Sequence, residues 1–404
     1  MKKENKAKSV KRGLKLLRIG WFFHNFMTII PVIVLVYVQK GITVGDFFLI
    51  QGIFRLAAFL FEIPSGYMSD CLSRKRVMIA GGIFSLAGFA TIAIAYGFWA
   101  LVLGEALLGI ASALFSGTLE AYTYDLLKRN NTQKQFLKEY GGIHSIATAA
   151  TLIASVLGGF LFARIGANGI LWLEVLFAAC AIFAFLFLPE LLEVRRIVKH
   201  KDAFVDALSI TTTTLKNPKL RNLIVFPSLF AAFTIVMFWA LQPIMEDAAV
   251  PVAVFGVFTS LNQLSSMFFS KYAYKICEKL GEIKVSIISI GTIIAGITMG
   301  LLATHINCMP LIYAACAILA LSVGIRQLNN LQYYTLIHHN VESKERGTVL
   351  STRAMVSTAL GSIFLIAAKF LMDGYGITTM LICLFGATIL LGISLKNVAK
   401  QINK

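Results

Sequence analysis

Charge is scarce in this sequence. Only 14% of its 404 residues are charged, whereas 57% are apolar, and the mean hydropathy is +0.77. Soluble domains carry about 25% charged residues, because charge must cover most of a water-facing surface. A water-soluble fold of this composition is therefore excluded, and the sequence predicts a protein embedded in lipid.

Strict alternation of apolar and polar residues is also lacking. Within lipid only helices and closed barrels satisfy every backbone hydrogen bond, and barrel strands alternate at every second residue. This sequence has long unbroken apolar runs instead. It therefore predicts an all-α membrane protein.

Twelve apolar runs have the length of ~20 residues that a bilayer crossing requires. They cover residues 17–38, 46–69, 76–97, 100–127, 140–162, 168–189, 221–245, 252–274, 284–304, 308–336, 347–371 and 376–396. The longest polar stretch between runs, 190–220, separates six runs from six. We expect a six-helix bundle over 1–189, a linker over 190–220 and a second six-helix bundle over 221–404. Helical spacing of apolar residues predicts an amphipathic helix in the linker, at Phe204, Ala207, Leu208, Thr211 and Leu215.

Acidic residues are few: 20 Asp and Glu against 37 Lys and Arg, a net charge of +17. Most of the basic residues fall in the connections that share one side of the membrane if there are twelve crossings. The positive-inside rule then predicts a multi-pass protein of the bacterial cytoplasmic (inner) membrane with both termini in the cytoplasm. No nucleic-acid motif is present. The expected partners are the lipid bilayer and a small-molecule substrate, and we expect a monomer.

Signatures of catalysis and metal binding are missing. The six cysteines form neither a CxxC pair nor a Cys/His cluster, which predicts no metal site. No Walker loop and no nucleophile–His–acid set can be assembled. The sequence therefore predicts a protein that is not an enzyme and has no cofactor, and a proton gradient is the expected energy source.

The most specific motif follows the second apolar run. It reads Gly66-Tyr-Met-Ser-Asp70-Cys-Leu-Ser-Arg74-Lys75-Arg76. This resembles the signature loop of the major facilitator superfamily (MFS), Gly-x-x-x-Asp-x-x-Gly-Arg-Arg/Lys-Arg/Lys, with a serine in place of the second glycine. The resemblance implies two six-helix bundles and a cytoplasmic gate latched by this loop, with Gly66 allowing two helices to approach closely. The alternative is that the basic run only anchors topology.

The fifth run contains a second, weaker resemblance. Gly141, Gly158 and Gly159 keep the spacing of the superfamily's antiporter-associated motif, whose remaining positions are alanine or serine here. Small residues allow close helix packing. The remnant favours efflux over uptake, and ordinary packing is the alternative. The phrases Phe-Glu-Ile-Pro-Ser-Gly and Ser-Gly-Thr-Leu-Glu-Ala-Tyr-x-Tyr-Asp-Leu-Leu look like those of bacterial permeases without an assigned substrate.

Charged and polar residues within the runs are the candidates for substrate or proton binding. They are Asn25, Arg55, Glu62, Glu105 and Arg326. Such groups are costly in lipid and must face protein or a water-filled cavity. Arg55 and Glu62, seven residues apart, share one helix face. Because a membrane disfavours the charged form of a carboxyl group, Glu105 is a candidate proton site; a hydrated position near the helix end is the alternative.

Charged residues near the cytoplasmic ends of the runs are candidates for the gate. Besides the signature loop, they are Glu120, Asp125, Arg346 and Arg353. We expect the two arginines to pair with Asp70, Glu120 or Asp125.

The resemblance implies transport by alternating access. Proton-coupled export of a small, partly apolar compound is the leading prediction. The alternatives are uptake of a nutrient or ion, and a membrane sensor or assembly factor that keeps the fold without transporting.

Overall fold

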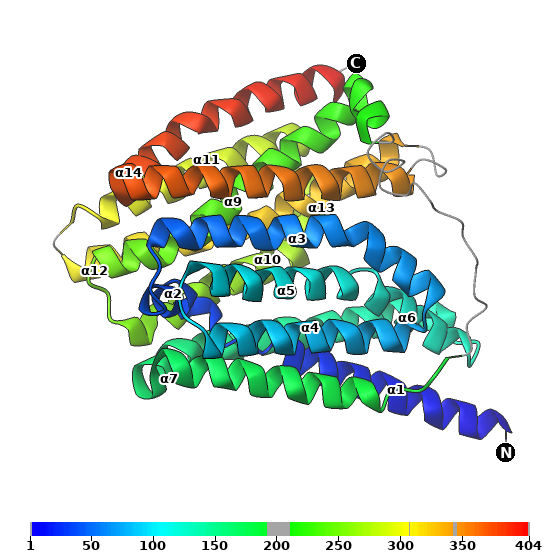
Figure 1. The fold of residues 1–404 in the computed structure, drawn as a ribbon. Coiled ribbons are helices and arrows are strands. Elements are labelled where there is room, and N and C mark those ends of the chain that lie inside the picture. Colours follow the sequence, from blue (N-terminus) through cyan, green and yellow to red (C-terminus); the bar gives the residue numbers. More distant parts are fainter. Residues whose placement is uncertain (1, 192–210, 307, 342–345, 403–404) are drawn as a thin grey trace. The chain divides into compact units, whose positions relative to one another are not determined.

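The computed structural model describes residues 2–191, 211–306, 308–341 and 346–402. Most of the predicted linker helix, including Phe204, Ala207 and Leu208, lies outside these ranges. The described residues form helices and no strand (Figure 1). The α-helices are α1 (Lys2–Asn25), α2 (Ile33–Gln39), α3 (Val44–Cys71), α4 (Arg74–Ile94), α5 (Phe98–Phe115), α6 (Thr118–Lys128), α7 (Phe136–Leu186), α9 (Pro218–Asp247), α10 (Phe255–Leu280), α11 (Glu282–Ala303), α12 (Met309–Gly324), α13 (Arg326–Asn340) and α14 (Arg346–Ile402).

Ten segments of the described chain are long and apolar enough to cross a membrane. Two of the helices in them, α7 with 51 residues and α14 with 57, bend sharply at Gly166 and Gly376. Both glycines have positive φ, 68° and 78°, a conformation that side chains disfavour. At 1.5 Å per residue α7 would be ~77 Å long if straight, more than twice the ~30 Å of a bilayer core. Figure 1 shows α14 running out in orange and returning in red. The ten segments therefore fit twelve crossings.

The chain divides into two compact units. Unit 1 comprises 1–41 and 56–201, and unit 2 comprises 42–55 and 202–404. The division differs from the predicted halves at residues 42–55, which come from the first half of the sequence but pack in unit 2. The helix α3 thus begins in unit 2 and ends in unit 1.

The core of unit 1 is formed by five helices, α1, α4, α5, α6 and α7. Leu17, Met78, Phe115, Tyr122 and Phe185 are buried together in it. Tyr122 lies in α6, and its hydroxyl donates a hydrogen bond of 2.8 Å to the carbonyl oxygen of Pro189. Large side chains from five helices therefore fix the packing of this unit.

Unit 2 is built around α9, which packs along α14 and contacts α12 and α13. The side chains of Phe226, Phe230 and Phe233 are completely buried, as is that of Met237. Phe233 contacts Phe364 of α14, with ring centroids 5.2 Å apart. The almost fully apolar sequence of α9 is explained by this central position.

Three of the predicted spans are interrupted. The first breaks between α1 and α2 around Pro31, and the fourth breaks at Gly117, where φ is 67°. The tenth breaks at Ile325, between α12 and α13. Interruptions of this kind free backbone groups inside a membrane and commonly mark binding sites in transporters.

Large apolar side chains cover the surface of both units. Ile94, Phe183, Phe370 and Ile389 are 64–68% exposed. A soluble protein rarely exposes so many large apolar groups, whereas lipid accommodates them. The surface therefore agrees with a membrane-embedded protein.

Candidate functional site: an arginine-lined pocket in unit 2

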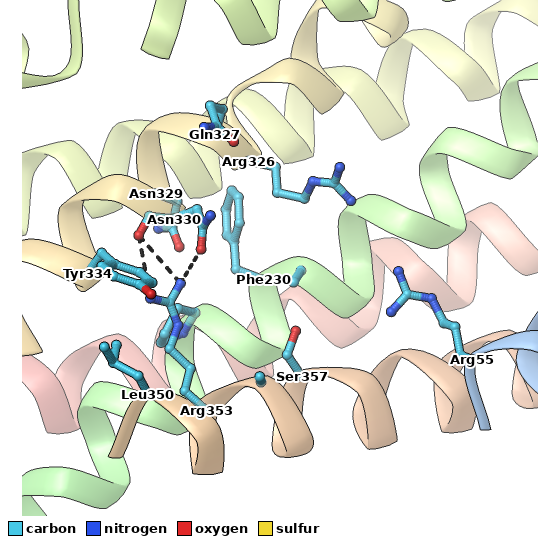
Figure 2. Close-up of a pocket in the computed structure, with 13 residues that line it drawn as sticks. Arg55, Phe230, Arg326, Gln327, Asn329, Asn330, Tyr334, Leu350, Arg353 and Ser357 are labelled. Atoms are coloured by element: carbon cyan, nitrogen blue, oxygen red, sulfur yellow. Dashed lines mark hydrogen bonds between the residues drawn. The ribbon is translucent and has the colours of Figure 1, made fainter. Parts of the chain in front are cut away.

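A polar pocket lies within unit 2, with a volume of about 320 Å³ (Figure 2). Its walls come from α3, α9, α13 and α14, and none of the described residues that line it is acidic. They are Arg55, Pro227, Phe230, Ala231, Arg326, Gln327, Asn329, Asn330, Tyr334, Leu350, Arg353, Ala354 and Ser357.

The pocket lies deep along its helices. Arg55 follows Val44, the first residue of α3, by 11 residues, which is ~17 Å along the axis. Arg326 begins α13, after the 16 residues of α12. An arginine at the centre of a membrane helix costs about 2.5–3.5 kcal/mol on insertion scales. Three arginines in one cavity therefore need a compensating role.

Arg353 is held in place by its neighbours. Its guanidinium donates to the side-chain Oδ1 of Asn330 and to the carbonyl oxygen of the same residue at 3.4 Å. It also lies over the ring of Tyr334, 5.7 Å from the centroid, a cation–π arrangement. Arg353 was expected to pair with a gate carboxylate. It binds Asn330 instead, because its face of α14 points toward α13.

Arg55 and Arg326 have no ion-pair partner in the described part of the chain. Both lie beside the same cavity in Figure 2. Arg55 passes over Gly361 of α14, where a Cβ atom would lie 2.9 Å from its Nη1. The two guanidinium groups therefore keep their donors available to the cavity.

Asn329 adds an unused donor. Its side chain is only 1% exposed, and its Nδ2 finds no hydrogen-bond partner among the described residues. A buried amide without a partner is costly, about 1–3 kcal/mol. Asn329 thus brings a donor that the described residues leave unpaired into the pocket wall.

Unit 1 contains two carboxylates at its helix interruptions, of which Glu174 is buried and Glu62 is exposed. Glu174 of α7 is 2% exposed and accepts hydrogen bonds from Thr28 Oγ1 at 2.7 Å and the Ile29 N–H at 3.0 Å, in the break of the first span. Glu62 of α3 accepts one from Ser116 Oγ at 2.9 Å, beside the break of the fourth span. Glu174 thus binds a backbone N–H at one break, and Glu62 binds a side chain beside another.

Glu105 is buried, 3% exposed, and accepts a hydrogen bond of 2.7 Å from Tyr37. It is therefore enclosed by protein rather than hydrated at a helix end. Glu174 was not among the predicted site residues. The same signal, a carboxylate inside an apolar run, would have found it.

A model of the Major Facilitator Superfamily matches residues 19–366. The match covers most of the chain. The protein belongs to the Major Facilitator Superfamily. It is therefore a multi-pass membrane transporter by family.

Similarity to curated relatives is local. The chain is 30% identical over 131 residues to the inner membrane transport protein YajR of Escherichia coli K12, which is 32% of this chain and 28% of that protein. It is 28% identical over 149 residues to the uncharacterized transporter BU466 of Buchnera aphidicola, 36% of this chain and 37% of that one. The matches thus span about a third of these transporters.

Solved transporter structures share the whole fold. The nucleoside transporter NupG superposes with a TM-score of 0.80 over 96% of this chain and 99% of that one, at 14% identity. The human organic anion transporter MFSD10 gives a TM-score of 0.61 at 17% identity, over 96% and 99% of the two chains. At these identities the likeness shows the fold alone.

The superfamily's signature loop has its partners within unit 1. Arg74 pairs with Asp125 and donates a hydrogen bond of 3.0 Å to the carbonyl oxygen of Ala121. Ser73, which replaces the usual glycine, is the N-cap of α4, and its hydroxyl accepts from the Arg76 N–H at 3.4 Å. Lys75 and Arg76 lie 3.8 and 4.0 Å from the carboxylate of Glu190. The side chains of Asp70 and Arg346 lie outside the described residues.

The remaining predicted residues have mixed surroundings. Glu120 is exposed at the start of α6, and Asn25 donates to the carbonyl of Trp21 at 2.7 Å, near the end of α1. Gly158 backs directly onto the first span: a Cβ there would lie 2.2 Å from the Thr28 carbonyl oxygen. Gly159 is buried in the same helix.

Two of the predicted packing glycines make no close approach. At Gly66 and Gly141 a Cβ would meet nothing within 4 Å in the described structure. The close helix approach predicted at Gly66 therefore stays a prediction.

A charged cluster joins the beginning of α3 to α14. Lys369 Nζ lies 2.5 Å from Asp46 Oδ1 and 2.8 Å from Asp373 Oδ2, and Thr43 donates to Asp373 at 2.9 Å. Further along, Ser362 donates to the carbonyl of Gly52 at 2.9 Å. These bonds explain why 42–55 packs in unit 2. Among the described residues, no group of three or more His, Cys, Asp or Glu could hold a metal ion.

Proposed function

We propose that this protein is a proton-coupled secondary transporter that exports a small polar solute by alternating access. The observation that carries the proposal is the pocket of unit 2. Arg55 and Arg326 lie deep in membrane-spanning helices without an ion-pair partner in the described chain, and Asn329 has an unused donor. A structural role would pair such groups, so we assign them to solute binding.

Charged clusters stand at both ends of α3. The Asp46–Lys369–Asp373 cluster lies at its beginning, on the side that the sequence predicts to be periplasmic. The loop cluster around Arg74 and Asp125 follows its end. The helix α3 itself has 28 residues, a length of ~42 Å along its axis. We propose that the first cluster holds the outer gate and the second contributes to the cytoplasmic gate, each opening when the other is closed.

Three carboxyl groups of unit 1 are the candidates for the coupled proton: Glu62, Glu105 and Glu174. Each accepts a hydrogen bond, from Ser116, Tyr37 and Thr28 respectively. Glu174 accepts the Ile29 N–H in the break of the first span, so a change in its protonation would act on the backbone there. This links a proton to helix movement.

The proposed location is a bacterial cytoplasmic membrane, with both termini inside and the protein acting as a monomer. The positive-inside distribution of 37 basic residues supports this orientation. A reporter fused after Arg195 tests it. We expect cytoplasmic activity, and a periplasmic signal would contradict the orientation.

The function is tested with purified protein in proteoliposomes that contain a pH-sensitive dye. We expect proton movement that depends on an added solute in the wild type and is lost in Arg326→Gln. An uptake transporter would move solute and proton in the same direction. A sensor or assembly factor would give no solute-dependent proton movement with any class of solute tried.

A further inference from the structure

The pocket in unit 2 has a charge pattern that specifies its ligand. Three guanidinium groups, those of Arg55, Arg326 and Arg353, line one cavity of about 320 Å³, and no described lining residue is acidic. The charges repel one another, and no carboxylate among the described residues neutralises them. The chemical complement of this site is an anion.

The arginines form two separate basic centres. Arg353 is fixed by the Asn330 oxygens and the Tyr334 ring. In Figure 2, Arg326 and Arg55 lie on the other side of Phe230. A guanidinium has five N–H donors in a planar fork that matches a carboxylate or phosphate. Arg353 uses its donors only toward Asn330, and the other two arginines donate to no described group. Each centre can therefore take one acidic group.

The rest of the wall restricts the size and polarity of the ligand. A cavity of about 320 Å³ is near the lower end of the range for small-molecule sites, so the ligand is small. Phe230, Leu350 and Pro227 supply apolar surface, and Gln327 and Ser357 supply neutral polar groups. A short carbon frame between two acidic groups fits this wall.

We propose that the pocket binds a small organic dianion, with carboxylate or phosphate groups at its two ends. The inference deepens the proposed function by naming the solute class of the same pocket. Transport through the pocket is a separate question, because binding can be measured without it.

The test uses the full-length protein purified in detergent and measures its thermal stabilisation by matched probes at constant ionic strength. Succinate, succinamate and succinamide share one carbon frame but carry charges of −2, −1 and 0. Malonate, glutarate and adipate with their diamides extend the series, and glycerol phosphate against glycerol tests a phosphate. We expect at least one dianion to bind tenfold or more tightly than its neutral analogue, with the monoanion between them. Equal binding of neutral and dianionic members throughout would overturn the inference.

Variants locate the binding. Arg326→Gln and Arg353→Gln should each weaken binding of the best dianion about tenfold or more, and Arg326→Lys should retain part of it. The matched control is Arg221→Gln, an exposed arginine of α9 that does not line the pocket, and it should bind normally. Dianion binding that is unaffected by the pocket variants would overturn the assignment to this cavity.

The two proposals fail separately. Charge-ordered binding without flux in proteoliposomes would contradict transport and leave the ligand class standing. Flux of a neutral solute that binds as tightly as any dianion would contradict the ligand class and leave transport standing.

Discussion

Gly361 lies on the face of α14 that also presents Arg353 and Ser357, eight and four residues before it. A Cβ at this position would come within 2.9 Å of the Arg55 guanidinium, the flexible end of that side chain. Gly361→Ala should therefore leave the fold intact and move Arg55 away from its present position. We expect dianion binding to weaken several-fold while the melting temperature without ligand stays the same or rises, since alanine favours helix over glycine by about 1 kcal/mol.

The matched control is Gly386→Ala in the same helix, where a Cβ meets nothing within 4 Å. It should share the gain in helix propensity and bind normally. Normal binding by Gly361→Ala would show that the position of Arg55 does not matter for the ligand.

Glu174 is the buried carboxylate with the most direct contact to an interrupted span. Glu174→Gln keeps an oxygen that can accept from Thr28 and Ile29 and removes the titratable group. If Glu174 carries the coupled proton, this variant should still exchange solute across the membrane. It should lose the ability to transport solute against a concentration gradient. Glu62→Gln and Glu105→Gln are the parallel variants. Concentrative transport with unchanged pH dependence in Glu174→Gln would remove Glu174 from the candidates.

Single residues of the site were partly predictable. Arg55, Arg326 and Glu105 stand out because a charge inside an apolar run is costly wherever it lies. Their grouping was not predictable, because Arg55 and Arg326 come from distant helices and nothing local indicates that they share a cavity. The role of Arg353 was missed for the same reason: its position near a helix end suggested a gate, and only packing against α13 places it in the pocket.

At the scale of helices, α7 packs against the break in the first span through Gly158. The Thr28 carbonyl would lie 2.2 Å from a Cβ at this position, and a backbone atom cannot move aside as a side-chain tip does. Gly158→Ala should therefore force the two helices apart and destabilise the protein by about 1–3 kcal/mol. Gly141→Ala, in the same helix with open space, should be neutral or slightly stabilising. Melting temperatures of the two variants provide the measurement, and equal values would show that the close approach is not needed.

The Asp46–Lys369–Asp373 cluster should hold the first turns of α3 against α14. Lys369→Ala removes both ion pairs, to Asp46 and to Asp373. Partly exposed pairs contribute up to about 1 kcal/mol each, so deuterium uptake over 44–52 should become several-fold faster, with α4 unchanged. Uptake identical to that of the wild type would show that Phe47, buried against Trp239, is sufficient to hold this segment.

The helices themselves were largely predictable, since membrane length and apolar runs determine them. The interruptions of the helices were harder to predict, although Pro31 and Gly117 are helix-breaking residues at two of them. The packing of 42–55 in unit 2 could not be predicted from the sequence. It depends on the bonds from Lys369 to Asp46 and from Ser362 to Gly52, and each joins residues more than three hundred positions apart.

For the whole molecule, the charge of the ligand determines how the membrane potential drives transport. A cell interior that is negative drives anions outward, by about 2.3 kcal/mol per charge for each 100 mV. Export of a dianion in exchange for one entering proton would move three charges in the favourable sense, about 7 kcal/mol per 100 mV. Uptake of a dianion with two protons would move no net charge. The two directions of coupling therefore differ in their response to membrane potential.

The most direct test is the efflux of a labelled dianion from proteoliposomes at a fixed pH gradient, with potentials set by potassium and valinomycin. The label is carried by the tightest-binding probe of the charge series. We predict that an inside-negative potential accelerates efflux in the wild type, and that Arg326→Gln abolishes it while Arg221→Gln does not. An efflux rate that changes neither with the potential nor in Arg326→Gln would contradict proton-coupled export through this pocket.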